Sequence, residues 1–459
     1  MGKPKVKTKP VSVTDGCRHA TRNPCRLCTP FGACMVFHGI SGCVPFIHGS
    51  QGCATYIRRY LIGHYREPVD IACSNFSEPS TVFGGKQNLE TGLTNVAAQY
   101  HPEMIGICTT CLAETIGDDV PMFLHEIKKQ HPELPGLVHV ATPSYCGTHT
   151  DGFNRAVRSV IEALAQSGVK HKGVNLFSGM LSPADLRYLK EIMTDFELST
   201  MMLPDYSDSF DGVVWGQYEK NIEHGTALAG IAKAAGACAS IEFRSTASSK
   251  DSAGGYLLKR FGTPYYGMPI PISVKDTDRF LSVVSQLSGR VPPDKYDGER
   301  GRLIDAYVDG HKYVFEKRAV VYGEEDLVVA LASFLSEIGI IPALCASGGH
   351  SGRLRDALAE QIPEMMPDVT VLEDTDFWDI AAAAKDARPD LIVGNSNGYK
   401  LKRELGIPLI RVGLPIHDRI GASRILHVGY RGAQQLYDRI VNALIEQQQE
   451  ESPIGYTHI

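Results

Sequence analysis

The chain has 459 residues, of which 43% are apolar and 21% are charged, and its formal net charge is −6. This composition is ordinary for a globular protein, and the length suffices for roughly three domains of about 150 residues. The charge does not indicate nucleic acid, no run of about 18 apolar residues predicts a membrane span, and the basic N-terminus lacks the apolar segment of a signal peptide. We therefore expect a cytoplasmic protein that binds neither nucleic acid nor a membrane.

Cysteine is the residue type with an unusual distribution. Ten of the twelve cysteines lie within the first 146 residues, and only Cys238 and Cys345 lie beyond them. A secreted disulfide scaffold would be short and would carry a signal peptide, so reduced thiols crowded into one region indicate a metal site instead. Cys73, Cys238 and Cys345 are expected to serve as small buried hydrophobic residues.

The first part of the chain is predicted to alternate strands and helices. Residues 1–24 are expected to form a polar arm, and 25–168 a first α/β domain. Apolar runs predict strands, and residues three or four apart predict helices between them. The predicted strands are Val44–His48, Met104–Cys108 and Leu137–Ala141, and the predicted helices are Ala54–Tyr65, Pro121–Lys129 and Arg155–Gln166.

The same alternation predicts a second domain over 169–302 and a third over 303–459, with a charged linker at Asp294–Arg302. A last helix is expected over Gly432–Gln448. We therefore predict an α/β protein with three Rossmann-like domains, whose parallel sheets are flanked by helices. The further predicted strands are Val174–Ser178, Ser199–Leu203, Ala319–Tyr322, Ile341–Cys345, Val369–Leu372, Leu391–Val393 and Leu409–Val412.

Two nucleotide-binding motifs are absent from the sequence. The chain contains no G-x-x-x-x-G-K-[ST] stretch and no G-x-G-x-x-G stretch. We expect that it neither hydrolyses ATP nor binds a dinucleotide in the usual way.

Three candidate ligands directly follow predicted strands. Cys53 follows the strand that ends at His48, Cys111 follows the strand over Met104–Cys108, and Ser144 follows the strand over Leu137–Ala141. Since loops at the carboxyl ends of parallel strands gather at one edge, these residues are expected to lie together. Cys28 comes from the preceding loop and can reach the same edge. Three thiolates and a hydroxyl fit an iron–sulfur site, although they do not complete a four-thiolate cluster.

Other interpretations of these cysteines stay open at this point. Cys25/Cys28 and Cys108/Cys111 are each C-x-x-C pairs, so zinc is possible, but the pairs are about 80 residues apart and zinc ribbons use about 15–20. A thioredoxin-like dithiol at Cys108/Cys111 is a further alternative. Cys53 could also be a reactive thiol with His48 as its base, although His48 is expected rather to satisfy a hydrogen bond near the turn.

Six segments of the sequence together resemble one known family. In order and spacing they are similar to the β-type subunit of nitrogenase component 1, and the likeness is strongest over residues 22–155. The segments are NPCRLCTPFGA, HGSQGCATYIRRYLIGHYREP, STVFGGKQNLETGL, CTTCLAETIGDD, TPSYCGTHTDGF and VGYRGAQQLYDRIVNALIE.

The resemblance implies a ligand set and partners. Carried over by motif, Cys28, Cys53, Cys111 and Ser144 would bind half of an eight-iron P-type cluster. An α-type (D-like) subunit, expected in an α2β2 complex, would bind the other half and hold the catalytic cofactor. Electrons would come from a separate ATP-hydrolysing iron protein that carries a 4Fe-4S cluster. We expect that protein to dock near Glu114, Asp118 and Asp119, unless the two aspartates only cap the following helix.

The chain also departs from the family pattern. It lacks the long N-terminal extension of molybdenum-nitrogenase β subunits and carries extra thiols, of which Cys146 lies two residues after Ser144 and could replace or assist it. The substrate could thus be dinitrogen or a carbon–sulfur bond of a methylthio-alkane. The alternative is the N-type subunit of a cofactor-assembly scaffold, which would hold a 4Fe-4S cluster. The other extra thiols are Cys25, Cys34, Cys43 and Cys108.

Overall fold

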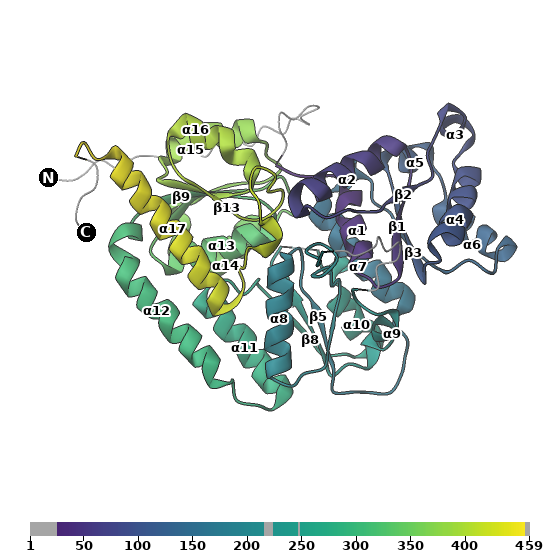
Figure 1. The fold of residues 1–459 in the computed structure, drawn as a ribbon, viewed down its shortest axis with the longest axis horizontal. Coiled ribbons are helices and arrows are strands. Elements are labelled where there is room, and N and C mark those ends of the chain that lie inside the picture. The colour runs from purple at the N-terminus through teal and green to yellow at the C-terminus, as the bar shows by residue number, and fades with distance from the viewer. Residues whose placement is uncertain (1–24, 215–223, 247, 455–459) are drawn as a thin grey trace.

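The computed structural model describes residues 25–214, 224–246 and 248–454. The predicted polar arm, residues 1–24 with Cys17, lies outside the described residues. The described chain forms three parallel sheets with helices packed against them, which confirms the predicted α/β class (Figure 1).

Each sheet consists of parallel strands, and the order of the strands in the sheet differs from their order along the chain. The first sheet has the order β2 (Ala72–Cys73), β1 (Cys43–His48), β3 (Met104–Thr109) and β4 (Gly136–Val140). The second has the order β6 (Thr200–Met202), β5 (Val174–Phe177), β7 (Ala239–Phe243) and β8 (Tyr265–Met268). The third has the order β11 (Thr370–Leu372), β10 (Ile341–Ala346), β9 (Arg318–Tyr322), β12 (Leu391–Gly394) and β13 (Leu409–Arg411).

The helices alternate with these strands along the chain. In order they are α1 (Thr29–His38), α2 (Gln51–Tyr65), α3 (Glu78–Phe83), α4 (Lys86–Tyr100), α5 (Cys111–Ile116), α6 (Val120–Gln130), α7 (His149–Leu164), α8 (Pro183–Asp195), α9 (Leu228–Ala232), α10 (Ala253–Phe261), α11 (Val274–Ser288), α12 (Asp294–Val314), α13 (Glu325–Glu337), α14 (Leu354–Gln361), α15 (Phe377–Ala387), α16 (Tyr399–Leu405) and α17 (Gly429–Glu451).

Every strand that the sequence predicts is present, with ends that differ by at most one residue. Strands β2, β7 and β8 were not predicted. The helix expected to begin near Arg155 in fact begins at His149, because Thr148 and Asp151 form a capping box in which Thr148 N donates to Asp151 Oδ2 (2.7 Å).

The linker predicted at Asp294–Arg302 is wrong, because these residues form the first half of α12. Tyr296 and Leu303 are buried one heptad apart, which gives this charged segment an apolar side. Its charges pair with neighbouring helices, as in the contact between Arg300 Nε and Asp278 Oδ1 (3.0 Å). The domain boundary predicted after residue 302 therefore falls inside a helix, and the domain limits stay predictions.

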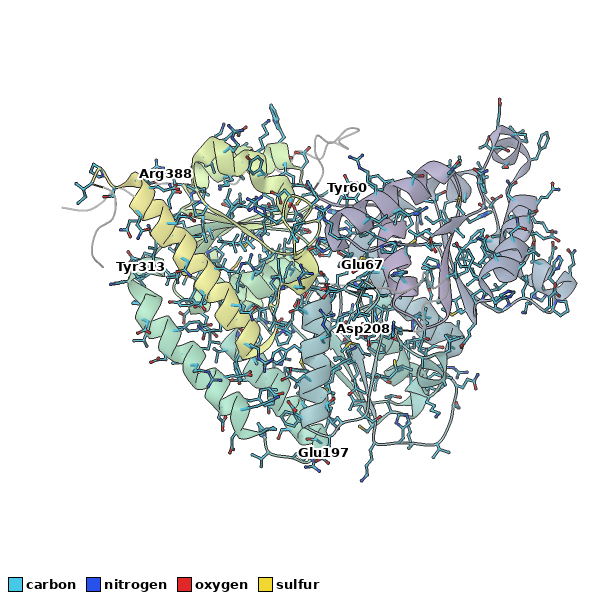
Figure 2. The ribbon with its side chains drawn as sticks, in the orientation of Figure 1. Tyr60, Glu67, Glu197, Asp208, Tyr313 and Arg388 are labelled. Atoms are coloured by element: carbon cyan, nitrogen blue, oxygen red, sulfur yellow. The ribbon has the colours of Figure 1, made fainter. Side chains whose placement is uncertain are left out.

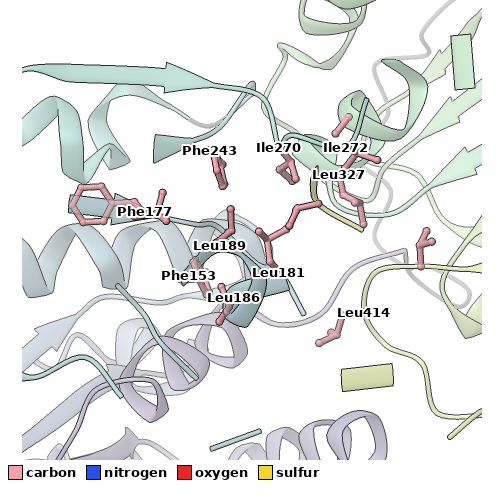
Figure 3. Close-up of a cluster of buried hydrophobic side chains, with 14 of the residues drawn as sticks. Phe153, Phe177, Leu181, Leu186, Leu189, Phe243, Ile270, Ile272, Leu327 and Leu414 are labelled. Carbon is pink, nitrogen blue, oxygen red and sulfur yellow. The ribbon is translucent and has the colours of Figure 1, made fainter. Parts of the chain in front are cut away.

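One hydrophobic core runs beneath all three sheets. Figure 3 shows part of it, where Phe153 of α7, Leu189 of α8, Phe243 of β7 and Leu327 of α13 come together. The three sheets are thus held in one arrangement by shared apolar burial.

Polar contacts also join distant segments. Glu67, which follows α2 and is labelled in Figure 2, accepts a hydrogen bond from Gly212 N (3.2 Å). His64 Nδ1 accepts one from Ile416 N (2.8 Å), which ties α2 to the region of the third sheet. Within the described ranges, none of the helices has the length and apolar character needed to cross a membrane.

Candidate metal centre

The four predicted ligands all lie where a helix or a helical turn begins. Cys53 is in the first turn of α2, after β1, and Cys111 is the first residue of α5, after β3. Ser144 opens a single 3₁₀ turn after β4, and Cys28 is the N-cap residue of α1. The positive end of a helix dipole favours a thiolate, so this placement suits metal ligation.

Hydrogen bonds bring Ser144 against Cys111 and the Cys28 loop. Ser144 N donates to Cys111 Sγ (3.2 Å), and Ser144 Oγ accepts from Thr29 N (3.2 Å). Burial raises the pKa of the Cys28 thiol, the Ser144 hydroxyl lowers it through a hydrogen bond, and the charges of Cys111 and Cys53 raise it. Each of the four side chains therefore acts on at least one other at this edge of the first sheet.

The loops that carry these residues are fastened to one another at the strand ends. Thr142 N donates to Thr109 Oγ1 (2.9 Å), and Thr142 Oγ1 donates to the Thr109 carbonyl (2.6 Å), which joins the ends of β3 and β4. A Cβ atom at Gly49 would lie 2.1 Å from Thr110 Oγ1, so only glycine permits β1 and β3 to end this close together. These contacts hold the strand ends that precede Cys53, Cys111 and Ser144 in place relative to one another.

Glycines also let α1 and α7 touch through their backbones. A Cβ atom at Gly32 would lie 1.8 Å from the His149 carbonyl oxygen, and one at Gly152 would lie 1.9 Å from the Thr29 carbonyl oxygen. Since Cys28 is the N-cap residue of α1 and α7 follows the Ser144 turn, this close packing fixes Cys28 relative to Ser144.

The donor set suits a cluster better than a single metal ion. Among the described residues, no three His, Cys, Asp or Glu side chains are grouped so that they could enclose a metal ion by themselves. The three thiols and the hydroxyl are each half-buried. Thiolates are the usual ligands of iron–sulfur clusters, so the residues fit such a group. A bound cation would also displace the Cys28 thiol proton, which burial helps to retain.

The remaining cysteines lie in other surroundings. Cys108 Sγ contacts Cys34 Sγ (3.7 Å) in the core, and Cys25 is buried beside the third sheet. The structure therefore does not support a zinc or dithiol interpretation of the C-x-x-C pairs. Of the three cysteines expected to be buried, Cys345 is buried, but Cys73 and Cys238 are only half-buried, because they lie nearer the protein surface.

His48 and Cys146 both lie close in sequence to proposed ligands and make contacts of their own. His48 Nε2 pairs with Asp118 Oδ2 (3.0 Å), so His48 binds a carboxylate near the turn and is not a base for Cys53. The side chain of Cys146 is exposed, and its carbonyl accepts a hydrogen bond from Arg155 Nη2 (3.0 Å).

Sequence reasoning missed a polar cavity of about 870 Å³ beside this centre. It is lined by the loops that follow β4, β7, β9 and β10, and it includes His149 and Glu324. These two residues are 175 positions apart, and no spacing in the sequence points to their contact.

Known proteins match this chain over most of its length. The family model described as nitrogenase component 1 type oxidoreductase matches residues 28–445. The chain belongs to this family. It is 33% identical to the nitrogenase molybdenum-iron protein beta chain of Clostridium pasteurianum, with 94% of each chain covered.

Further relatives carry different names at the same identity. The nitrogenase vanadium-iron protein beta chain of Trichormus variabilis is 33% identical, with 92% of this chain and 93% of that protein covered. The nitrogenase iron-molybdenum cofactor biosynthesis protein NifN of Nostoc is 33% identical over the same shares. The solved structure titled "Nitrogenase Cp1 at pH 6.5" matches with a TM-score of 0.92 at 32% identity, covering 96% of this chain and 97% of that chain.

Proposed function

We propose that this chain is the β-type subunit of a nitrogenase-like reductase and binds half of a P-type eight-iron cluster. Cys28, Cys53, Cys111 and Ser144 are the proposed ligands, and an α-type partner supplies the rest, in an α2β2 complex. The observation that carries the proposal is the gathering of these four donors at one sheet edge, through the contacts of Ser144 with Cys111 and with the Cys28 loop.

In this proposal the chain positions an electron relay. Cys28, Cys53, Cys111 and Ser144 would hold a P-type cluster, which would supply electron transfer between an ATP-hydrolysing iron protein and the catalytic cofactor of the partner. The residues of this chain hold the thiolates in fixed places, bury the Cys28 side of the site and present the Ser144 hydroxyl. The substrate, dinitrogen or the carbon–sulfur bond of a methylthio-alkane, is reduced in the partner.

The second candidate is the N-type subunit of a cofactor-assembly scaffold with a 4Fe-4S cluster. The 33% identity to a NifN protein favours it as much as the equal identity to β chains favours the relay subunit. The complete set of three thiols and one hydroxyl favours the relay, because a 4Fe-4S cluster shared with a partner would not need all four donors from this chain.

A single preparation tests both candidates. The chain is co-purified without oxygen together with the α-type subunit of its host, and iron per complex and turnover with the host iron protein are measured. About eight irons per pair at the shared site, with turnover, support the relay subunit. About four irons per pair and transfer of a cofactor precursor without turnover support the scaffold, and a complex without iron overturns both.

The two aspartates expected near the docking surface of the iron protein make contacts within this chain. Asp119 caps α6 by accepting from Met122 N (3.0 Å), which confirms the capping interpretation for that residue. Asp118 instead binds His48 and accepts from Gly85 N (3.1 Å), so its charge is engaged inside the protein. We propose that Phe83, which ends α3 directly before this glycine turn and is 87% exposed, contacts the iron protein.

A further inference from the structure

His149 and Glu324 form a buried pair beside the loop that carries Cys28. His149 Nε2 lies 2.9 Å from Glu324 Oε1, and the two side chains are only 5% and 8% exposed. Leu27 N donates to His149 Nδ1 (3.2 Å). Because Nδ1 accepts this bond, a neutral imidazole carries its proton on Nε2 and donates it to the carboxylate.

The pair connects the backbone amide of Leu27, the residue before Cys28, to the third sheet. His149 N also donates to the Leu27 carbonyl (3.0 Å), so His149 and Leu27 are joined twice. Glu324 is the N-cap residue of α13, directly after β9, and it lines the polar cavity. Two hydrogen bonds thus lead from the backbone beside a proposed ligand to a buried carboxylate on another sheet.

The negative charge of Glu324 acts on the thiol of Cys25, which lies three residues before Cys28. Burial first, and then the charge of Glu324, raise the pKa of the Cys25 thiol to about 12. Arg26 lies in the same loop, where its positive charge lowers the pKa of the Cys28 thiol against the effect of burial. Its guanidinium Nη1 also pairs with Asp374 Oδ1 (2.9 Å) near the surface. Charges in a buried environment act over longer distances than charges in water.

We propose that His149 and Glu324 are positioning residues for the cluster at Cys28, and that the charge of Glu324 lowers its reduction potential. This inference rests on the proposed function. Hydrogen bonds around a ligand fix its orientation, and nearby negative charge disfavours the addition of an electron to an iron–sulfur cluster.

The first test is Glu324→Gln in the complex with the α-type partner. Glutamine keeps an oxygen that can accept from His149 Nε2 but removes the charge. We expect unchanged iron content and a midpoint potential above that of the wild-type complex. The matched control is Glu325→Gln, a neighbouring buried carboxylate that lines the same cavity but accepts from Ser351 N (3.1 Å). Equal shifts in both variants, or no shift in Glu324→Gln, overturn the electrostatic part of the inference.

The second test concerns positioning and does not need the cluster. His149→Ala removes the acceptor of Leu27 N, so amide hydrogen exchange in the segment around Leu27 should become faster than in the wild type. Glu324→Gln should leave that exchange nearly unchanged. Wild-type protection in His149→Ala overturns the positioning role. A wild-type complex that lacks iron would instead overturn the proposed function, and the exchange result would still decide the role of His149.

Discussion

The first and third sheets present different chemistry at the carboxyl ends of their strands. The segments that follow β1, β3 and β4 begin helical turns that carry Cys53, Cys111 and Ser144, whereas the segments after β9 and β10 carry Glu324 and a glycine-rich turn. Both sheets are parallel, and their central strands are largely buried. The comparison teaches that the architecture decides where loop side chains gather, and that the residue type placed there decides whether the edge offers sulfur or carboxylate.

The two regions also use cysteine differently. Cys53 is half-buried at the start of a helix and accepts a hydrogen bond from Ser50 Oγ (3.6 Å). Cys345 is fully buried within β10, where burial raises the pKa of its thiol to about 12. A thiol at the edge of a sheet is available to a metal, whereas a thiol inside a strand contributes packing.

The largest expected effect concerns the thiols of the two regions. Cys53→Ala should abolish assembly of the cluster, because a strong iron–thiolate bond is lost and metal binding is linked to folding of the site. Cys345→Ala should cost at most about 1–2 kcal/mol of stability and keep the iron. Cys238→Ala should keep it as well. Iron analysis of complexes purified without oxygen checks this, and similar iron loss in all three variants would contradict the ligand assignment.

The next effect concerns the close contact of α1 and α7. Gly152→Ala should lower the free energy of unfolding by about 1–3 kcal/mol, since the added methyl group meets the Thr29 carbonyl. It should also reduce bound iron by moving Cys28 away from Ser144. Gly301→Ala in α12 is the control: outside the adjacent backbone of α12, no heavy atom of the described residues lies within 4 Å of the added Cβ, so stability should rise by about 0.5–1 kcal/mol. Denaturant unfolding that gives equal values for both variants would refute the packing argument.

A pH effect should sharpen the link between the first and third sheets. Burial lowers the pKa of His64 from 6.5 to about 3 in the folded protein. Between these two pH values the unfolded chain binds a proton at His64 that the folded chain does not. The contribution of neutral His64 to the free energy of unfolding is therefore fully present above about pH 6.5 and is lost as the pH falls towards 3.

His64→Asn keeps a hydrogen-bond acceptor for Ile416 N and removes the titration. Between pH 6 and 4, the slope of the unfolding free energy against pH should decrease by about 1.4 kcal/mol per pH unit, which corresponds to one proton. His311→Asn on the exposed surface should leave the slope unchanged. An unaltered slope in His64→Asn would mean that this histidine does not stay neutral in the folded protein.

A smaller effect distinguishes the hydroxyl from the thiols at the first edge. Ser144 is expected to ligate the oxidised cluster as an alkoxide, since a bound metal lowers the pKa of its ligands. Ser144→Ala should keep the iron of the reduced protein, raise the midpoint potential of that oxidation and weaken its pH dependence. Cys146→Ala should be silent in the same anaerobic redox titrations. The reverse pattern would assign the ligand to Cys146.

The smallest expected effect concerns docking. Phe83→Ser should lower electron transfer from the iron protein several-fold without changing the iron content, because an exposed aromatic side chain is lost from α3, which packs against the helix that begins at Cys111. Val308→Ser on α12 is a matched control, since this valine is 71% exposed but lies on a helix that carries no proposed ligand. Stopped-flow electron transfer checks the pair of variants, and equal rates would remove Phe83 from the docking surface.

The sequence by itself determined most of the strands and the position of the candidate ligands. Each of the three sheets is parallel and largely buried, so several of its strands appear as short apolar runs that can be located without the fold. Since carboxyl ends of parallel strands share an edge, the placement of Cys53, Cys111 and Ser144 together followed from their positions after those runs.

Only the tertiary structure decided the features that depend on distant packing. The charged segment from Asp294 is helical because its apolar side packs on α17 and its charges meet neighbouring helices. Cys108 faces the core whereas Cys111, three residues later, faces the edge, because the chain passes from strand to helix between them. The contact of His149 with Glu324 joins two sheets, and local periodicity carries no information about which loops meet across such an interface.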